Sequence, residues 1–167
     1  MTSQRLLPVI PNNCRLCFLQ ITYKLHFLQH TQLHAASVYF AVGLLSLPRT
    51  GNNPSMRMFT VFPGSKTYFS HLDISPRSRH MLSHGKKIVL AIAEGAKDIS
   101  KLMVTLAPLQ TLHAYQLRID PTNFKLLSHC MLVALSCYLG DDFTHVAHAA
   151  MDKYLSAFAA VLAEKYR

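Results

Sequence analysis

The hydrophobic residues of the chain follow two different patterns, which meet near residue 57. Beyond that point, apolar residues recur every three or four positions, the spacing of amphipathic helices. Few windows alternate with a period of two, so strands are not expected. Before that point, Pro8, Pro11, Pro48 and Pro54 interrupt short apolar runs that have no sustained period. The pattern predicts an all-α fold for the second region and an irregular first region.

Capping residues predict where several helices of the second region begin and end. Asn53 precedes Pro54, which is an N-cap followed by a first-turn proline. Asp120 and Pro121 repeat this arrangement for a later helix, and Gly140 is a typical C-terminal stop. Residues 62–78 are expected to form a polar and aromatic connection. A shorter helix is expected over roughly 101–115.

Two of the predicted helices present a broad apolar face. The first covers 79–99 and places on one side Met81, His84, Ile88, Ala91, Ile92 and Ile99. The last begins near Thr144, and its expected inner side carries Val146, Leu155, Phe158, Val161 and Leu162. Such faces bury themselves against neighbouring helices.

Length and charge narrow the possible classes of protein. The 167 residues, half of them apolar, can hold one ordinary domain and an extension. The formal charge of +9 arises mainly from the first 72 residues, which contain no acidic residue. It does not come from a Lys/Arg patch interleaved with aromatic residues, so nucleic-acid binding is not expected.

Cysteine spacing and hydropathy indicate in which cellular compartment the protein is expected and whether it is expected to associate with a membrane. Cys130 and Cys137 lie two turns apart on one predicted helix, about 10 Å, which is too far for a disulfide. We expect reduced, packed cysteines in a cytosolic protein. The most apolar stretch, residues 35–47, is too short to span a bilayer and too far along the chain for an ordinary signal peptide. No membrane association is expected.

Two histidines, His84 and His113, stand on apolar helix faces. Burying an imidazole without a partner is costly, and a single such histidine is usually bonded to a backbone carbonyl. Two of them on neighbouring helices can instead point at one another across a gap. That gap could hold a flat apolar ligand with a metal, and haem iron with a proximal histidine fits this arrangement.

Residues 57–167, about two thirds of the chain, resemble the α subunit of vertebrate haemoglobin, of the globin family and particularly of a fish type. The resemblance rests on RMF, KTYFSHLDIS, HGKK, LHAYQLRIDPTNFKLLSHC and MDKYLSAFAAVLAEKYR, in order and without a gap. It implies a globin-like helical fold whose first two helices are missing or replaced. It also implies haem b as cofactor, reversible dioxygen binding, no enzymatic activity, and a location in the erythrocyte cytoplasm.

The resemblance assigns a role to each histidine. His113 takes the place of the proximal ligand of the haem iron, and its Nδ1–H is expected to donate to the carbonyl of Leu109. His84 takes the place of the distal histidine, which donates a hydrogen bond to bound dioxygen. The other positions that match the haem pocket are Phe69, His71, Lys87, Ile88, Leu109, Leu112, Leu117, Ile119, Phe124, Leu127 and Leu162. Without the resemblance, most would be core residues, and His71 with Lys87 a solvated pair.

The resemblance also implies β-type globin partners in an α2β2 tetramer. The tight α–β contact matches Arg57, His129, Phe143, His148 and Asp152, and the sliding contact matches Thr67, Tyr68, Arg118, Asp120, Asn123, Tyr166 and Arg167. Gly64 and Ser70 depart from the family pattern near Thr67, which predicts a softer ridge at the contact that shifts between quaternary states.

Residues 1–56 do not resemble the family and are predicted to be an atypical extension before a globin domain at 57–167. Ser55 falls where a leucine normally closes the distal pocket. The abrupt change is typical of a different or mispredicted first coding segment. The alternative function is therefore a haem-less or unstable globin fragment that acts, if at all, through protein interaction. Cys14, Cys17, His26, His30 and His34 leave zinc binding open in this extension.

Replacing residues 1–56 by the two helices of an ordinary α-globin tests this view of the extension. Each uncompensated loss of a buried leucine-sized side chain costs about 2–5 kcal/mol. We therefore expect the chimera to melt at a higher temperature and to lose haem more slowly than the parent chain. Equal melting temperatures and equal haem-loss rates would contradict the prediction.

Overall fold

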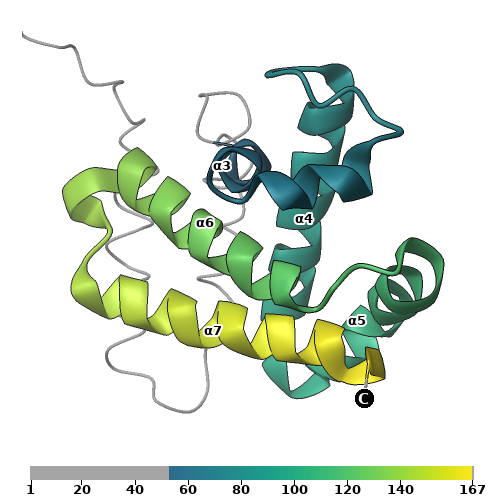
Figure 1. The fold of residues 1–167 in the computed structure, drawn as a ribbon. Coiled ribbons are helices and arrows are strands. Elements are labelled where there is room, and N and C mark those ends of the chain that lie inside the picture. The colour runs from purple at the N-terminus through teal and green to yellow at the C-terminus, as the bar shows by residue number, and fades with distance from the viewer. Residues whose placement is uncertain (1–52, 167) are drawn as a thin grey trace, which may run out of the picture.

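The computed structural model describes residues 53–166, and every regular element in that range is a helix (Figure 1). The all-α prediction is therefore confirmed for this part of the chain. The cysteine and histidine residues considered for zinc binding, and Arg167, lie outside the described residues.

The first described helix, α3, spans Pro54–Val61 and begins as the sequence predicts. The side chain of Asn53 accepts a hydrogen bond from the Ser55 amide at 2.9 Å, and Pro54 occupies the first turn. The connection predicted over residues 62–78 includes a further helical element. Pro63–Phe69 forms a 3-10 helix, η1. Such short 3-10 turns are common between longer helices.

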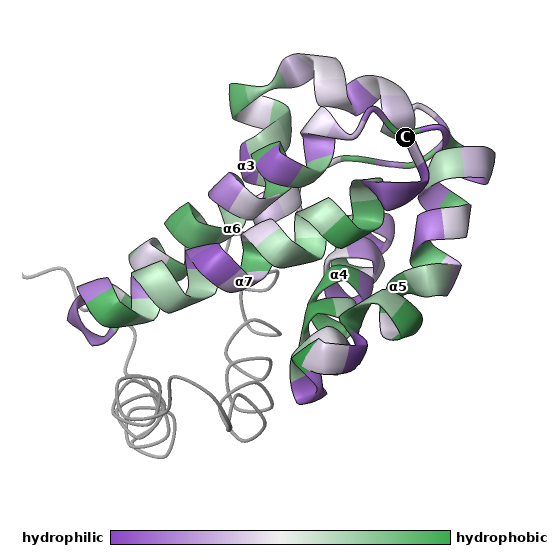
Figure 2. Ribbon diagram, turned by 90° about the horizontal axis from the view of Figure 1, so that it is seen from below, coloured by the Kyte–Doolittle hydropathy of each residue, from purple (hydrophilic) through white to green (hydrophobic). Residues whose placement is uncertain are grey.

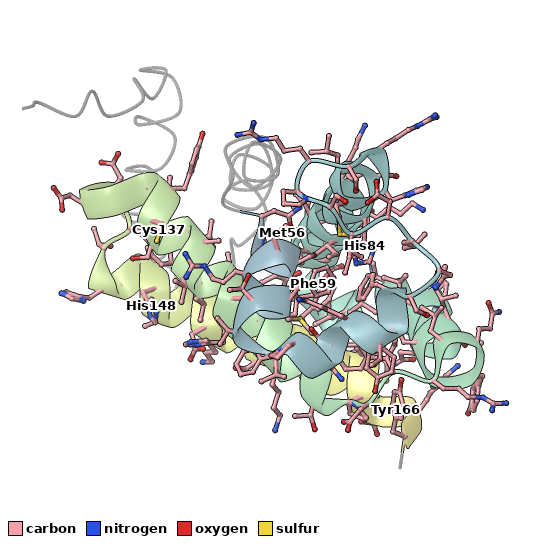
Figure 3. The ribbon with its side chains drawn as sticks, turned by 45° about the horizontal axis from the view of Figure 1, so that its top comes forward. Met56, Phe59, His84, Cys137, His148 and Tyr166 are labelled. Carbon is pink, nitrogen blue, oxygen red and sulfur yellow. The ribbon has the colours of Figure 1, made fainter. Side chains whose placement is uncertain are left out.

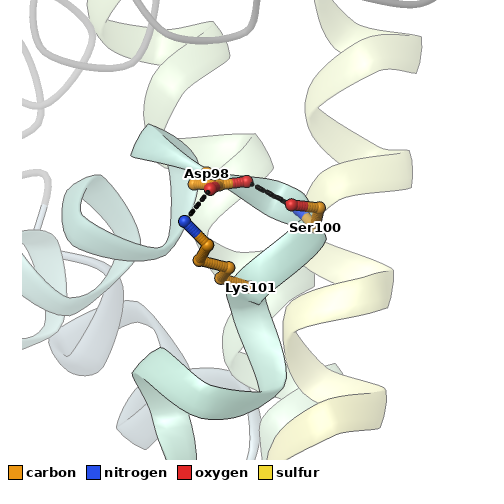
Figure 4. Close-up of polar contacts among 3 residues, drawn as sticks. All are labelled: Asp98, Ser100 and Lys101. Carbon is orange, nitrogen blue, oxygen red and sulfur yellow. Dashed lines mark hydrogen bonds and ion pairs between the residues drawn. The ribbon is translucent and has the colours of Figure 1, made fainter.

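The long helix α4 spans Arg79–Lys97 and ends two residues before the predicted end. Its first turn is capped by Ser78, whose Oγ accepts from the Met81 amide at 3.2 Å. Asp98 stops the helix with an extended backbone, and Ile99–Lys101 follows as a 3-10 turn, η2. Figure 4 shows how Asp98 holds this turn through Ser100 and Lys101. The Ser100 hydroxyl, first among several groups, lowers the pKa of this exposed carboxyl.

The helix predicted over 101–115 is two different elements. The α-helix α5 spans Leu102–Thr111, and the chain then continues as a π-helix, η3, over Leu112–Leu117. The π-helix ends at Arg118, whose φ of 50° places it in the left-handed region. One-turn π segments often lie at functional sites.

The last two long helices are α6, Thr122–Leu139, and α7, His145–Ala163. Helix α6 begins one residue after the predicted Pro121, and the carboxylate of Asp120 accepts from the Thr122 amide at 2.8 Å. It ends at Gly140, whose φ of 54° suits glycine. The short 3-10 turns η4, Gly140–Asp142, and η5, Glu164–Tyr166, follow the two helices.

Helices α6 and α7 lie side by side, with α3 across α6 and α5 beside the C-terminal part of α7 (Figure 1). Apolar and polar residues are interspersed along these helices (Figure 2), as expected for helices that bury one face. The main buried cluster draws on four helices and comprises Val89, Ile92, Ala96, Leu102, Leu106, Phe124, Met131, Leu132, Ala134, Leu135, Leu139, Phe143, Ala147, Tyr154, Leu155, Phe158, Ala159 and Leu162.

Two sequence predictions about burial need correction. Val146 was placed on the inner side of the last helix, but it is 42% exposed, and Ala147 is buried instead. The first turn of α7 is thus rotated by one residue from the predicted face. Cys130 and Cys137 are free thiols, as predicted, but only Cys130 is buried. Within residues 53–166, none of the helices combines the length and the apolar character that a membrane crossing requires.

Helices α4 and α7 approach closely at Gly95. The Tyr154 hydroxyl donates to the Ile92 carbonyl at 2.6 Å, and burial raises the pKa of Tyr154. A Cβ atom on Gly95 would lie 2.6 Å from Leu102 Cδ1 and 2.9 Å from the Tyr154 hydroxyl. Glycine at this position therefore leaves room for the Leu102 side chain and for the Tyr154 hydroxyl that bonds to α4.

Substituting Gly95→Ala should lower the free energy of unfolding by about 1–3 kcal/mol, because overpacking outweighs the better helix propensity of alanine. Gly64→Ala is the matched control, since nothing lies within 4 Å of a Cβ there. Urea unfolding measures both. Equal free energies of unfolding for the two variants would contradict the prediction, because the neighbours of Gly95 would then accommodate a methyl group without loss of stability.

Candidate functional site

His113 lies within the π-helix η3 and is half-buried. Its Nδ1 is 2.7 Å from the carbonyl oxygen of Leu109, which confirms the predicted hydrogen bond. A carbonyl only accepts, so the proton must reside on Nδ1 and the ring is oriented by this bond. The lone pair of Nε2 is then left available as a metal ligand.

The π-helix also redirects the backbone around His113. The carbonyl of His113 accepts from the amide of Arg118 and from that of Ile119, the latter at 3.1 Å. These wide turns close the C-terminal end of the element, and the left-handed Arg118 then sends the chain towards α6. The histidine thus sits on a short, firmly terminated segment rather than in a long regular helix.

His84, on α4, is also half-buried. Burial, with smaller contributions from His113 and Lys87, lowers its pKa from 6.5 to about 4. His84 is therefore neutral at pH 7 and can donate one N–H.

Two sets of aromatic rings surround the histidines. Phe69 meets His84 edge to face at 5.0 Å between ring centroids, and Phe59 meets Phe69 at 4.9 Å. On the other side, Phe124 meets His113 at 5.4 Å. Figure 3 shows Phe59 and His84 close together in one part of the molecule. Each imidazole is thus flanked by an aromatic side chain that restricts its rotation.

The predicted pocket residues fall into three groups. Phe124 and Leu162 belong to the buried core, and Ile88, Leu109 and Ile119 pack partly buried against it. A second group is half-buried without belonging to that cluster, namely Phe69, Leu112 and Leu127. The third group is exposed and comprises Leu117, at 43%, with His71 and Lys87. No contact joins His71 to the other predicted residues in the described structure, so its role in holding a propionate stays a prediction.

This arrangement fits a haem group on the chemistry of its donors. Among residues 53–166, no three His, Cys, Asp or Glu side chains gather into a protein-only metal site. A porphyrin supplies four nitrogen ligands itself, so one imidazole with a free Nε2 suffices. His113 offers that nitrogen, and its ring contacts the Leu109 carbonyl and the Phe124 side chain.

Comparison with known proteins agrees with this geometry. The globin family matches residues 56–162. The chain belongs to the globin family. Hemoglobin subunit alpha-D of Branta canadensis is 54% identical to it over 117 residues, which cover 70% of this chain and 83% of that protein. The alpha-D subunits of Anser indicus and Meleagris gallopavo are 52% and 53% identical, the latter over 66% of this globin and 79% of that protein.

These relatives support the resemblance to haemoglobin α subunits. They are bird proteins, so the fish-type character inferred from the sequence stays a prediction. The family match begins at residue 56, next to the predicted boundary of the globin domain.

Sequence reasoning missed two features of the site. Phe59 is 2% exposed and joins the distal aromatic pair, although it was noted only as part of the RMF stretch. The sequence already placed Ser55 at the distal pocket. Phe59 follows it by four residues and so shares its helix face, which is the signal that could have identified Phe59. The π-helix has no equivalent signal, because its wider turns are a response to tertiary contacts.

The lowered pKa of His84 predicts a dependence of stability on pH. Between pH 6.5 and about 4 the unfolded chain binds a proton at this residue and the folded chain does not, so the free energy of unfolding falls as pH falls. The parent should lose about 2–3 kcal/mol of its free energy of unfolding through this residue between pH 7 and pH 4. The His84→Leu variant should not show this part of the loss.

Urea unfolding of the haem-free protein between pH 7 and pH 4 measures this difference, so that acid release of haem does not enter. The control is His145→Gln, since His145 is exposed. Parallel pH profiles for the parent and His84→Leu would contradict the assigned cause.

Proposed function

We propose that this globin is a haem-binding oxygen carrier of the haemoglobin α type, with His113 as the proximal ligand and His84 as the distal residue. The observation that carries the proposal is the Nδ1 hydrogen bond of His113 to Leu109, and a neutral, half-buried His84 accompanies it. Membership of the family and the similarity to alpha-D subunits support it.

When bound, haem supplies a ferrous iron that takes up and releases dioxygen. The chain's own residues provide the rest. The Leu109 carbonyl keeps the proton of His113 on Nδ1 and so keeps Nε2 free for the metal. The N–H of His84 donates towards the ligand, a bond that contributes roughly 1 kcal/mol. Phe69, Phe124 and the half-buried aliphatic residues limit the access of water, which would promote oxidation of the iron.

The same proposal includes β-type globin partners in an α2β2 tetramer. Phe143 and His148 pack at 5.5 Å between ring centroids, and Arg57 lies 3.8 Å from the Cys137 thiol. Cys137 and His148 lie at the end of the α6–α7 pair away from His84 (Figure 3). His148 is one of the positions that the resemblance assigns to the tight contact. At the sliding contact, the Tyr68 hydroxyl accepts from the Asp120 amide at 3.2 Å.

The proposal describes a carrier, in which the ligand leaves chemically unchanged, rather than an enzyme. A location in the erythrocyte cytoplasm accompanies the proposal as a prediction. The alternative, a haem-less fragment acting by protein interaction, differs from it in one property: the purified chain reconstituted with haem would then show no Soret band.

Substitution of each histidine should have a different effect. His113→Gly removes the only protein bond to iron, so haem should be released or weakly held. His84→Leu removes a hydrogen bond alone, so haem should stay. Oxygen binding should weaken about fivefold, for a loss of about 1 kcal/mol, and oxidation of the iron should speed up.

Haem transfer to an acceptor protein and the rate of autoxidation measure these outcomes. His145→Gln serves again as a control at an exposed position. If His113→Gly held haem as tightly as the parent, another residue would be the proximal ligand.

A further inference from the structure

Ser55 carries a buried polar atom that the fold does not use. The residue is 3% exposed, and its Oγ has no hydrogen-bond partner within the described chain. Buried polar groups almost always have a partner, so each exception requires an explanation. Ser65 shows the usual situation, because it is 4% exposed and its Oγ donates to the Phe62 carbonyl at 2.7 Å.

Ser55 lies on α3, the helix whose Phe59 begins a chain of aromatic contacts that leads to His84. It stands one helical turn before Phe59, so the two side chains share a face of the helix. Phe59 contacts Phe69, and Phe69 contacts His84. Helix α3 also packs against α4, which carries His84. The unpartnered hydroxyl therefore lies one helical turn from an aromatic chain that ends at the distal imidazole.

We propose that the Ser55 hydroxyl is a second hydrogen-bond donor of the distal site, acting on dioxygen together with His84, either directly or through one bridging water. This inference rests on the proposed function. Dioxygen held at a ferrous iron gains partial negative charge, which a hydroxyl donor stabilises. Carbon monoxide gains much less, so the hydroxyl favours dioxygen over carbon monoxide.

The fold itself gives no reason to retain this hydroxyl. Removing a buried group that has no partner should leave stability unchanged or raise it, whereas removing the partnered Ser65 hydroxyl should lower it. A hydroxyl that acts on the ligand should affect ligand binding and not the free energy of unfolding. A structural hydroxyl should do the reverse, so both quantities are measured on the same variants.

The test compares the haem-loaded parent with Ser55→Ala, Ser55→Thr and the control Ser65→Ala. We expect Ser55→Ala to release dioxygen about three to ten times faster, the loss of one neutral hydrogen bond, with little change in carbon monoxide release. The C–O stretching band of its carbon monoxide complex should move to higher frequency. Ser55→Thr, which keeps the hydroxyl, should restore most of the parental values. Ser65→Ala should melt at a lower temperature with parental ligand kinetics.

Two outcomes would overturn the inference, and they are distinguishable. A parent chain with a normal Soret band, whose Ser55→Ala variant has the same dioxygen release rate and the same C–O band, removes the role of Ser55 alone. A parent chain with no Soret band after reconstitution removes the proposed function and this inference together.

Discussion

The hydrogen bond from His113 Nδ1 to the Leu109 carbonyl is the constraint on which the candidate site depends. It is 2.7 Å long and lies at the junction of α5 and the π-helix η3. Because a carbonyl cannot donate, the bond selects one tautomer and aims one nitrogen lone pair away from the helix backbone. The aromatic contact with Phe124 then restricts the ring plane. Everything proposed for the metal follows from this one oriented nitrogen.

The two histidines differ because their surroundings differ. His113 is hydrogen-bonded to the Leu109 carbonyl, and this bond fixes the direction of its Nε2. His84 has a pKa lowered to about 4, chiefly by burial, so it remains a neutral donor over the whole physiological range. An oxygen carrier requires this division, since a protonated distal imidazole would no longer present the same hydrogen-bonding groups to a ligand.

Local chemistry was predictable from the sequence to the extent that it depends on near neighbours. The cap at Asn53, the stop at Gly140, the Asp120 carboxylate at the start of α6 and the Leu109 bond all involve residues within a turn of one another. Val146 was misplaced because the periodic pattern does not determine how the first turn of a helix is rotated. The π-helix around His113, the burial of Phe59 and the unpartnered Ser55 hydroxyl depend on contacts between elements, for which one sequence carries no distance information.

The bond between Tyr154 and the Ile92 carbonyl has a mechanical consequence. It fastens α4, which bears His84, to α7, and α5 packs on α7 through a separate contact just before His113. Helix α7 is therefore bonded both to α4 and to α5, the helix that leads into the segment of His113. A displacement of α7 would act on both histidine-bearing segments at once. Because packed side chains interlock, such a displacement occurs in steps rather than continuously.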